Sequence, residues 1–600
     1  MRMYQAAGLA LLAFGSMAAG AARWQAPVHP DAARDDAAAL AMLDPSRLAA
    51  AACAERARAS TPVLLRRLQQ AAALMGPIVP GKFPLYGGVP RSALEPGGLT
   101  AEARPWFDQG LEMAYNFNHA AAVASFRKAQ ALAPGCALCF WGEALVQGPN
   151  INAPMEAKAL APTLNALAKA QALAGTAPPL DRALIGALAA RYSANPTADR
   201  AAMDAAYADA MLGLATAHPA NDEIAVLAAE AAMDTSPWNY WQPGRSEPRV
   251  RIDKAVALIE GVLARHPGHQ QAAHLYIHLM ENYVSPARAE KAADALALGA
   301  MPEAGHLVHM PGHIFYRIGR YKDSIRANVA AAKSDEAYLA RVPDDGLYRY
   351  GYYPHNVHFI VTSAQQAGDL GLAVAQARKL LRIIPEDKAV ELGWVQAVVA
   401  APSFAFAQGG SPAQILGLRR PDARLPYVRA MWHYARGVAF ARLKQADALA
   451  RELAAMDRLT ADPGIKALEA QGVPGTDLIH LAQHVMRGRM AYARGDFAAA
   501  AEHYRKAQAI EGTIPYQEPP YWYYPVGQSL GAALLAGGKA AEARDAFHQA
   551  LLVAPGNGWA LWGLAQSEAA LGHKLEARAA EAALDRAWLG DRRLLTLERL

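Results

Sequence analysis

The sequence predicts an all-α protein built as a repeat array. A chain of 600 residues is too long for one compact hydrophobic core, so several domains or a series of stacked repeats must share it. Alanine, the strongest helix former, recurs among leucine, arginine and glutamate along the chain. Runs of Val, Ile and Thr that alternate with polar residues are scarce, which leaves β-strands little support.

Composition narrows the class of partner. Hydrophobic residues make up 53% of the chain and charged residues 19%, which is typical of a globular protein. The 59 basic and 54 acidic residues give a net charge of +5, which is nearly neutral for this length. The sequence has no block of Lys and Arg of the kind that contacts a phosphate backbone. We therefore expect no nucleic-acid partner.

The N-terminus predicts export. Arg2 precedes an apolar stretch at 6–17, and Ala19-Gly20-Ala21 supplies a small-x-small cleavage pattern. We expect residues 1–21 to be a cleaved signal peptide and the mature protein to be soluble and periplasmic or secreted. The alternative is an uncleaved helix that begins the solenoid. No later run reaches the roughly 18 to 20 apolar residues of a membrane span.

The chain has three cysteines, Cys53 and the C-x2-C pair Cys136 and Cys139. In an exported chain such a pair favours a structural disulfide over a metal site, because no second C-x2-C or His pair follows at zinc spacing. No His follows Cys139 directly, so the pair is not a c-type haem attachment signature.

Three windows share small and aromatic positions at one spacing, and two of them also share a proline. They are Gly110, Ala122, Phe126, Ala129 and Pro134; Gly488, Ala500, Tyr504 and Ala507; and Gly531, Ala543, Phe547, Ala550 and Pro555. This pattern resembles the tetratricopeptide repeat (TPR), a unit of 34 residues with two antiparallel helices. The resemblance, to the large exported bacterial type of TPR protein, implies a helix-turn-helix superhelical solenoid with a concave groove.

The resemblance also divides the chain. Residues 22–100, with a Pro/Gly-rich stretch, are expected to form an irregular or helical leader or cap, and residues 101–600 the solenoid. The clearest repeats are 103–136, 305–338, 354–387, 481–514, 524–557 and 558–590. The register is weak at 160–250 and 390–470, although helices are expected there.

Histidines gather in the middle of the predicted solenoid. Seven of the 18 lie between residues 274 and 358, where an even spread would place two or three. With one glutamate they form three sets spaced for one helical face each: His274, His278 and Glu281; His306, His309 and His313; His355 and His358. Pro311 interrupts the second set, so it either begins the helix after His306 and His309 or kinks it.

The repeat register predicts where these sets point. In the TPR family, positions 2, 5, 9, 12 and 13 of the first helix line the concave groove. With repeats phased at Gln270, Gly305 and Pro354, the three sets occupy such positions. The resemblance therefore implies one shared surface on three adjacent helices. We expect five neighbouring residues to line the groove or to orient the histidines: Tyr276, Tyr316, Tyr352, Tyr353 and Asn356.

Imidazoles with a carboxylate suit a transition metal, namely Cu, Fe or Zn. Seven imidazoles exceed the needs of one tetrahedral ion, so either two ions bind or some residues orient the ligands. The sequence has no H-E-x-x-H motif, so a zincin protease is not indicated. The alternative to metal binding is that the histidines of the groove bind an acidic peptide.

Two functions follow from this pattern. The first is an exported metalloprotein, as a metal-dependent oxidoreductase or hydrolase, that acts on a small molecule or peptide in the groove. The alternative is a non-catalytic scaffold that binds a partner protein or peptide in the same groove. The loop 148–154 and the aromatic clusters 238–241 and 521–524 are expected to form groove walls.

Overall fold

The computed structural model describes residues 67, 70–71, 73–74 and 83–600, apart from 196, 245 and 343–344. The predicted signal peptide 1–21, Cys53 and the leader before residue 67 lie outside the described residues. Within the described part of the chain every named element is a helix, and the only β pairing is two isolated bridges. The predicted all-α fold is confirmed.

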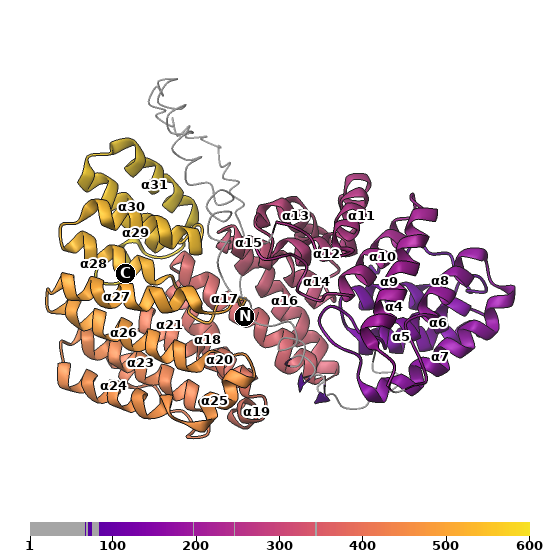
Figure 1. The fold of residues 1–600 in the computed structure, drawn as a ribbon, viewed down its shortest axis with the longest axis horizontal. Helices are drawn as coiled ribbons and strands as arrows, with labels where there is room; N and C mark the ends of the chain where they lie inside the picture. The colour runs from indigo at the N-terminus through magenta and orange to yellow at the C-terminus, as the bar shows by residue number, and fades with distance from the viewer. Residues whose placement is uncertain are drawn as a thin grey trace, which may run out of the picture.

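Successive helices joined by short turns pack as pairs along the chain (Figure 1). The first half contains α4 (Arg104–Tyr115), α5 (His119–Leu132), α6 (Ala137–Val146), α7 (Leu160–Leu173), α8 (Pro179–Ala189), α9 (Arg200–Ala217), α10 (Asp222–Asp234), α11 (Ile252–Arg265), α12 (Gln270–Met280), α13 (Glu290–Gly299), α14 (Gly305–His309), α15 (Pro311–Arg317) and α16 (Tyr321–Arg341). The second half contains α17 (Tyr353–Ala367), α18 (Leu370–Ile383), α19 (Glu386–Glu391), α20 (Gln396–Val399), α21 (Ala401–Gly409), α22 (Pro412–Leu416), α23 (Pro426–Arg442), α24 (Ala446–Thr460), α25 (Pro463–Ala470), α26 (Gly475–Ala493), α27 (Phe497–Thr513), α28 (Val526–Ala536), α29 (Ala540–Val553), α30 (Gly558–Leu571) and α31 (Lys574–Ala587).

Glycine–aromatic contacts set the distance between neighbouring helices. A Cβ added at Gly531 on α28 would lie 2.8 Å from the Phe547 ring on α29, and one at Gly563 on α30 would lie 2.2 Å from it. The Phe547 ring therefore wedges among three successive helices. Gly110 stands in the same relation to Phe126, at 2.7 Å. This packing of a small residue against an aromatic ring is what the repeat pattern predicts, and the fold is a TPR-type α-solenoid.

Replacing Gly531 with alanine is expected to lower the free energy of unfolding by about 1–3 kcal/mol, because the added methyl group meets a fully buried ring. Gly213→Ala on α9 is the matched control, since a Cβ there meets nothing within 4 Å and alanine favours the helix. Thermal unfolding of both variants measures the effect. A Gly531→Ala protein as stable as Gly213→Ala would contradict the packing.

The second half curls back on itself. The indole Nε1 of Trp559 on α30 donates to the backbone oxygen of Gln365 on α17, at 2.8 Å. The backbone N of Leu589 donates to Ala367 O at 2.7 Å. Helices nearly 200 residues apart in the sequence thus meet, as the yellow and salmon ribbons do in Figure 1. This closure brings the loops of the last repeats over the histidine-bearing helices.

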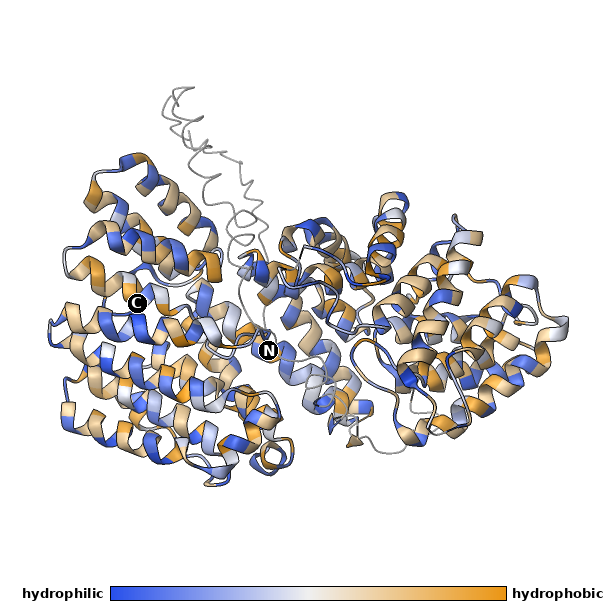
Figure 2. Cartoon of the chain, viewed as in Figure 1, coloured by the Kyte–Doolittle hydropathy of each residue, from blue (hydrophilic) through white to orange (hydrophobic). Residues whose placement is uncertain are grey.

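The first half also brings distant segments together. Asn116, just after α4, accepts hydrogen bonds through Oδ1 from the backbone N–H groups of His306 and Leu307, at 2.9 and 3.2 Å, so it satisfies free donors at the start of α14. Polar and apolar residues alternate around the helices of both halves (Figure 2). Among the helices described, none is long and apolar enough to cross a membrane.

Candidate metal centre

Three neighbouring segments carry the histidine cluster. His274 and His278 lie on α12, and Glu281 follows that helix as its C-cap. His306 and His309 lie on the short helix α14, while His313 lies on α15. Met310 keeps helical backbone angles between the two, so Pro311 breaks the helix without moving the earlier histidines into a loop.

The third segment begins with an unusual turn. Residues Tyr348–Tyr352 form a single π-helical turn that continues directly into α17, which carries His355 and His358. A π turn widens the helix by one residue and is often found at functional sites. Here it places the aromatic rings of Tyr350 and Tyr352 in the wall of a cavity.

The first group of histidines, triad A, consists of His274, His278 and His306. Their ligand atoms lie within 4.8 Å of one another, and all three side chains are buried. The Nε2 atoms of His274 and His306 are 3.2 Å apart. Nitrogen ligands at about 2.05 Å from a tetrahedral ion are separated by about 3.3 Å, so this pair already has the spacing of two ligands.

The second group, triad B, consists of His309, His313 and His355. Their ligand atoms also lie within 4.8 Å of one another. The Nε2 atoms of His309 and His313 are 2.8 Å apart, which is the distance of a hydrogen bond through one shared proton. The edge of the Phe359 ring contacts all three imidazoles, with centroids 4.9–5.2 Å away.

Amide and carboxylate oxygens hold the outer nitrogen of four imidazoles. His274 Nδ1 lies 2.9 Å from Gln271 Oε1, and His309 Nδ1 lies 2.7 Å from Asn328 Oδ1. Both amides are oriented by donating their N–H groups elsewhere, to Glu230 and to the Ser324 backbone oxygen. Their oxygens therefore accept from Nδ1–H, so the Nε2 lone pairs of both rings face the neighbouring imidazoles His306 and His313.

Glu281 joins the two triads. Its Oε1 lies 3.1 Å from His278 Nδ1, and its Oε2 lies 2.8 Å from His313 Nδ1. Glu518, on the loop before α28, approaches the same His313 nitrogen at 2.7 Å. A carboxylate on the outer nitrogen of a ligating imidazole fixes its ring and raises its basicity. Glu281, His313 and Glu518 also form a third group whose ligand atoms lie within 4.8 Å.

Charge in the cluster is concentrated at this carboxylate bridge. Burial alone lowers the pKa of His313, but the Glu281 and Glu518 carboxylates outweigh it and raise the pKa to about 10. Burial raises the pKa of Glu281, yet His313 and His278 bring it down to about 2. Burial lowers the pKa of the other imidazoles of both triads, so they are neutral at pH 7 and keep lone pairs for a metal.

Two strained aromatic residues cover triad A. Phe117 and Trp238 have backbone φ angles of 51° and 61°, a region that bulky residues rarely adopt. The Phe117 ring lies 4.8 Å from His274 and 5.2 Å from His306, and the Trp238 ring lies 5.2 Å from His278, between centroids. Such strain persists where surrounding structure enforces it, frequently at functional sites.

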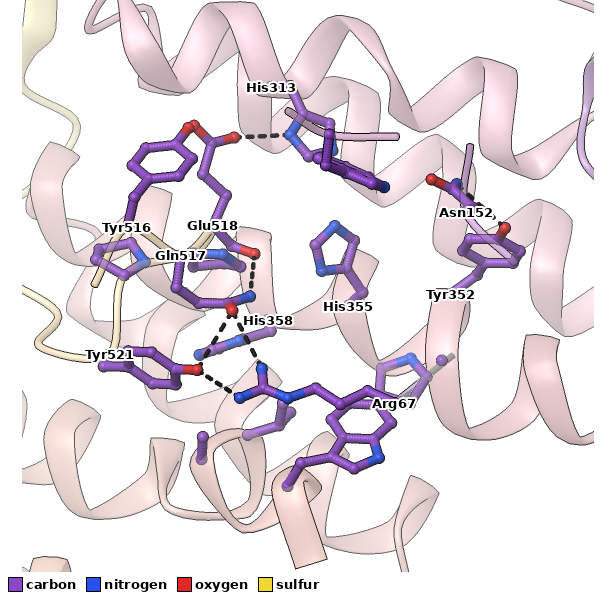
Figure 3. Close-up of a pocket in the computed structure, with 18 of the residues that line it drawn as sticks. Arg67, Asn152, His313, Tyr352, His355, His358, Tyr516, Gln517, Glu518 and Tyr521 are labelled. Carbon is purple, nitrogen blue, oxygen red and sulfur yellow. Dashed lines mark hydrogen bonds and ion pairs between the residues drawn. The ribbon is translucent and has the colours of Figure 1, made fainter. Parts of the chain in front are cut away.

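A cavity of about 180 Å³ opens beside triad B (Figure 3). His313 and His355 reach it, and Glu518 and Tyr352 stand at opposite sides of the opening. Its wall is mainly apolar and aromatic. Its aromatic lining includes Trp238, Tyr350, Trp394, Tyr516 and Tyr521.

The remaining predicted residues lie outside the two triads. His358 faces the cavity but places its Nε2 2.5 Å from Tyr523 OH, and it belongs to none of the three groups. The Tyr276 and Tyr353 hydroxyls donate to Glu260 and Glu336. The other two expected neighbours stay close by: Tyr316 packs its ring on Phe359, and Asn356 donates to Asp335.

Sequence reasoning missed several members of the site. Phe117, Gln271, Asn328 and Glu518 carry no motif. Gln271 lies one turn before His274 on α12, and the other three reach the histidines from other segments of the solenoid. All three expected groove walls do face the cavity, through Asn152 of the loop 148–154, Trp238 of the cluster 238–241 and Tyr521 of the cluster 521–524. The aromatic run that begins at Tyr521 was the nearest signal to Glu518, three residues before it.

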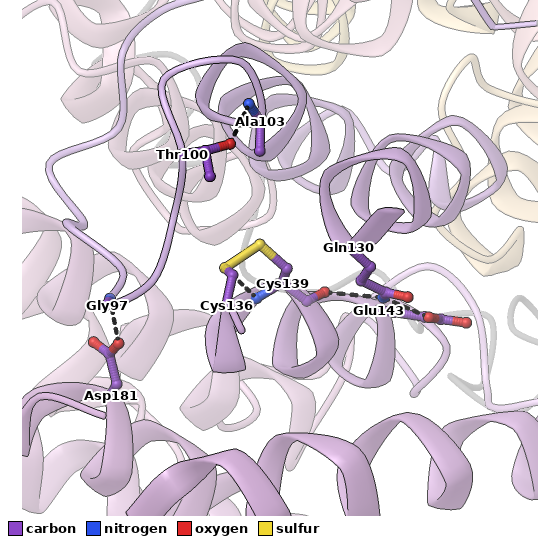
Figure 4. Close-up of a disulfide and its surroundings, with 8 residues drawn as sticks. All are labelled: Gly97, Thr100, Ala103, Gln130, Cys136, Cys139, Glu143 and Asp181. Carbon is purple, nitrogen blue, oxygen red and sulfur yellow. Dashed lines mark hydrogen bonds between the residues drawn. A yellow bond between two sulfur atoms is a disulfide. The ribbon is translucent and has the colours of Figure 1, made fainter. Parts of the chain in front are cut away.

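The C-x2-C pair lies apart from the histidine cluster. Cys136 and Cys139 are joined by a disulfide at the start of α6, and both are fully buried (Figure 4). Gln130 on α5 donates to the backbone oxygen of Cys139 and to Glu143. The disulfide thus joins the N-cap residue of α6 to the first turn of the same helix, in the buried core.

Comparisons with known proteins give distant structural likeness. No protein-family model and no curated protein match the chain. The human IFIT1 dimer with m7Gppp-AAAA aligns over 79% of this chain and 94% of its own, at 15% identity and a TM-score of 0.29. The Cut9–Hcn1 hetero-tetramer of the APC/C aligns over 82% and 97%, at 15% identity and a TM-score of 0.23. The fold assignment therefore rests on the packing of the helix pairs and not on these TM-scores.

Proposed function

We propose that this chain is an exported transition-metal protein whose histidine cluster holds Cu, Fe or Zn beside a cavity that admits a small molecule or a peptide. The observation that carries the proposal is the His278 imidazole. Its Nδ1 is committed to Glu281, while its Nε2 is buried without any hydrogen-bond partner and lies among the ligand atoms of triad A. A buried lone pair left unpaired is costly, and a bound cation removes that cost.

The ligand set allows chemistry at the bound ion. Three imidazoles leave one coordination position of a tetrahedral ion open, which is the arrangement of catalytic sites. An ion with an open position activates water or polarises a bound substrate, so the centre serves a hydrolase or an oxidoreductase. The aromatic cavity beside His313 and His355 is the route by which a substrate reaches it.

Elemental analysis of the full chain after reconstitution with copper(II), iron(II) or zinc(II) tests the proposal. We expect stoichiometric retention of one of these metals, with a clear loss in His278→Ala and His313→Ala. His433→Ala is the matched control, because His433 is also buried and paired with a glutamate, Glu452, but lies outside the cluster. A chain that retains no metal would leave the non-catalytic peptide-binding scaffold as its function.

Export is part of the proposal and has its own test. Arg2, the apolar stretch 6–17 and the small residues near 20 support a secretion signal. N-terminal sequencing of the protein expressed in a bacterial host should find a new N-terminus close to residue 22 in the periplasmic fraction. An intact N-terminus in the cytoplasm would remove export and leave the metal centre unaffected.

A further inference from the structure

We propose that the cluster holds two metal ions of unequal access: an enclosed ion in triad A, and an ion in triad B that faces the cavity and takes a small ligand with a lone-pair donor. The inference rests on the proposed function, since it presumes that the histidines bind metal. It adds how many ions bind, where each one lies, and which of them a ligand from solution reaches.

Ring separations divide the six histidines into two centres. Within triad A the ring centroids are 4.8, 5.0 and 5.8 Å apart, and within triad B they are 4.6, 4.9 and 5.6 Å apart. Between the triads the ring centroids are farther apart, at 6.1 Å from His306 to His309 and 6.4 Å from His278 to His313. Each ion therefore has three imidazoles, and no imidazole is needed twice.

Access separates the two centres. His313 and His355 of triad B line the cavity of about 180 Å³, whereas no member of triad A does. The rings of Phe117 and Trp238 close triad A, and the Tyr352 ring lies 4.9 Å from His306. An ion in triad A is thus shielded from solutes, while an ion in triad B has its open position toward the cavity.

The bridging carboxylate explains why two ions are tolerated so close together. Glu281 is 2% exposed and stands between His278 of triad A and His313 of triad B. Its negative charge, with that of Glu518 on the other side of His313, offsets the repulsion between two buried cations. The group of Glu281, His313 and Glu518 then supports the ions through the outer nitrogen of His313 and holds none itself.

Copper(II) and azide test the inference on the full chain. We expect two copper ions per chain in the parent and in His433→Ala, and one in His306→Ala and in His355→Ala. Azide added to the copper-loaded protein should give a charge-transfer band in the parent and in His306→Ala, and lose it in His355→Ala. Circular dichroism checks folding, and the His306→Gln and His355→Gln pair replaces any alanine variant that fails to fold.

The outcomes separate this inference from the proposed function. One copper per chain, lost in both variants, overturns the two-ion inference and leaves metal binding standing, whereas no copper at all removes both. An azide band that survives in His355→Ala and vanishes in His306→Ala reverses the assigned access. Loss of a whole ion in Glu518→Ala places a metal at the third group and also overturns the inference.

Discussion

Replacing Glu281 with alanine is expected to weaken copper(II) binding at both triads by about 10- to 100-fold while leaving the number of bound ions unchanged. The reason is geometric. The two carboxylate oxygens hold the outer nitrogens of His278 and His313, at 3.1 and 2.8 Å, so one residue orients a ligand in each triad. Without it, His278 loses the acceptor that fixes its Nδ1–H and aims Nε2 at the ion, and His313 keeps Glu518 as its one carboxylate.

Competition titration against a chelator of known affinity measures this loss. Glu281→Gln should also weaken binding, because an amide offers one acceptor oxygen and turns an N–H donor toward the second Nδ1–H. Glu452→Gln is the matched control, since its carboxylate is likewise buried against a histidine, His433, outside the cluster. Unchanged affinity in Glu281→Ala would remove its positioning role, and loss of a complete ion would make Glu281 a direct ligand.

The fold was predictable because its information is local. The glycine, alanine and aromatic positions recur within single helix pairs, and the contact of Gly531 with Phe547 spans only the turn between two helices. The helical face of His274, His278 and Glu281 is local in the same way. Spacing of this kind predicts which side chains share a face without any knowledge of how the superhelix curves.

The grouping of the histidines was not predictable in the same way. His306, His309 and His313 were expected as one set, but His306 joins triad A and the other two join triad B. Two turns of helix separate His306 from His313 by about 10 Å along the axis, too far for one ion. Which neighbour each imidazole meets depends on adjacent helices, and a helical face alone does not specify that.

Contacts between segments far apart in the sequence could not be predicted from the sequence pattern. Glu518 meets His313 across 205 residues, and Asn116 caps α14 across 190. The first contact follows the closure of the second half, in which α30 returns to α17, and the second follows the way the first half folds back from α4 to α14. The small rotation of each repeat relative to the last accumulates over many repeats, so a short pattern does not fix where the end of the array returns.

A second large effect is expected far from the metal centre, at Arg191. Its guanidinium is 2% exposed and bonds Asp204 on α9 at 3.1 Å and Asp234 on α10 at 2.6 Å, and it lies 4.8 Å over the Tyr207 ring. Arg191→Met keeps most of the volume but leaves the buried Asp234 without its cation, whereas Asp204 keeps Arg200 at 2.8 Å. We expect the free energy of unfolding of the first half to fall by about 3–5 kcal/mol.

Amide hydrogen exchange, compared between α8–α10 and the second half, locates the loss, and thermal unfolding measures its size. Arg505→Met is the matched control, because the Arg505–Glu542 pair is about half exposed on both sides and should change stability by less than about 1 kcal/mol. Adding Asp234→Asn to Arg191→Met should recover part of the loss, since one uncompensated charge disappears. If the double variant is no more stable than the single one, the cost comes from lost packing on Tyr207 and not from the stranded carboxylate of Asp234.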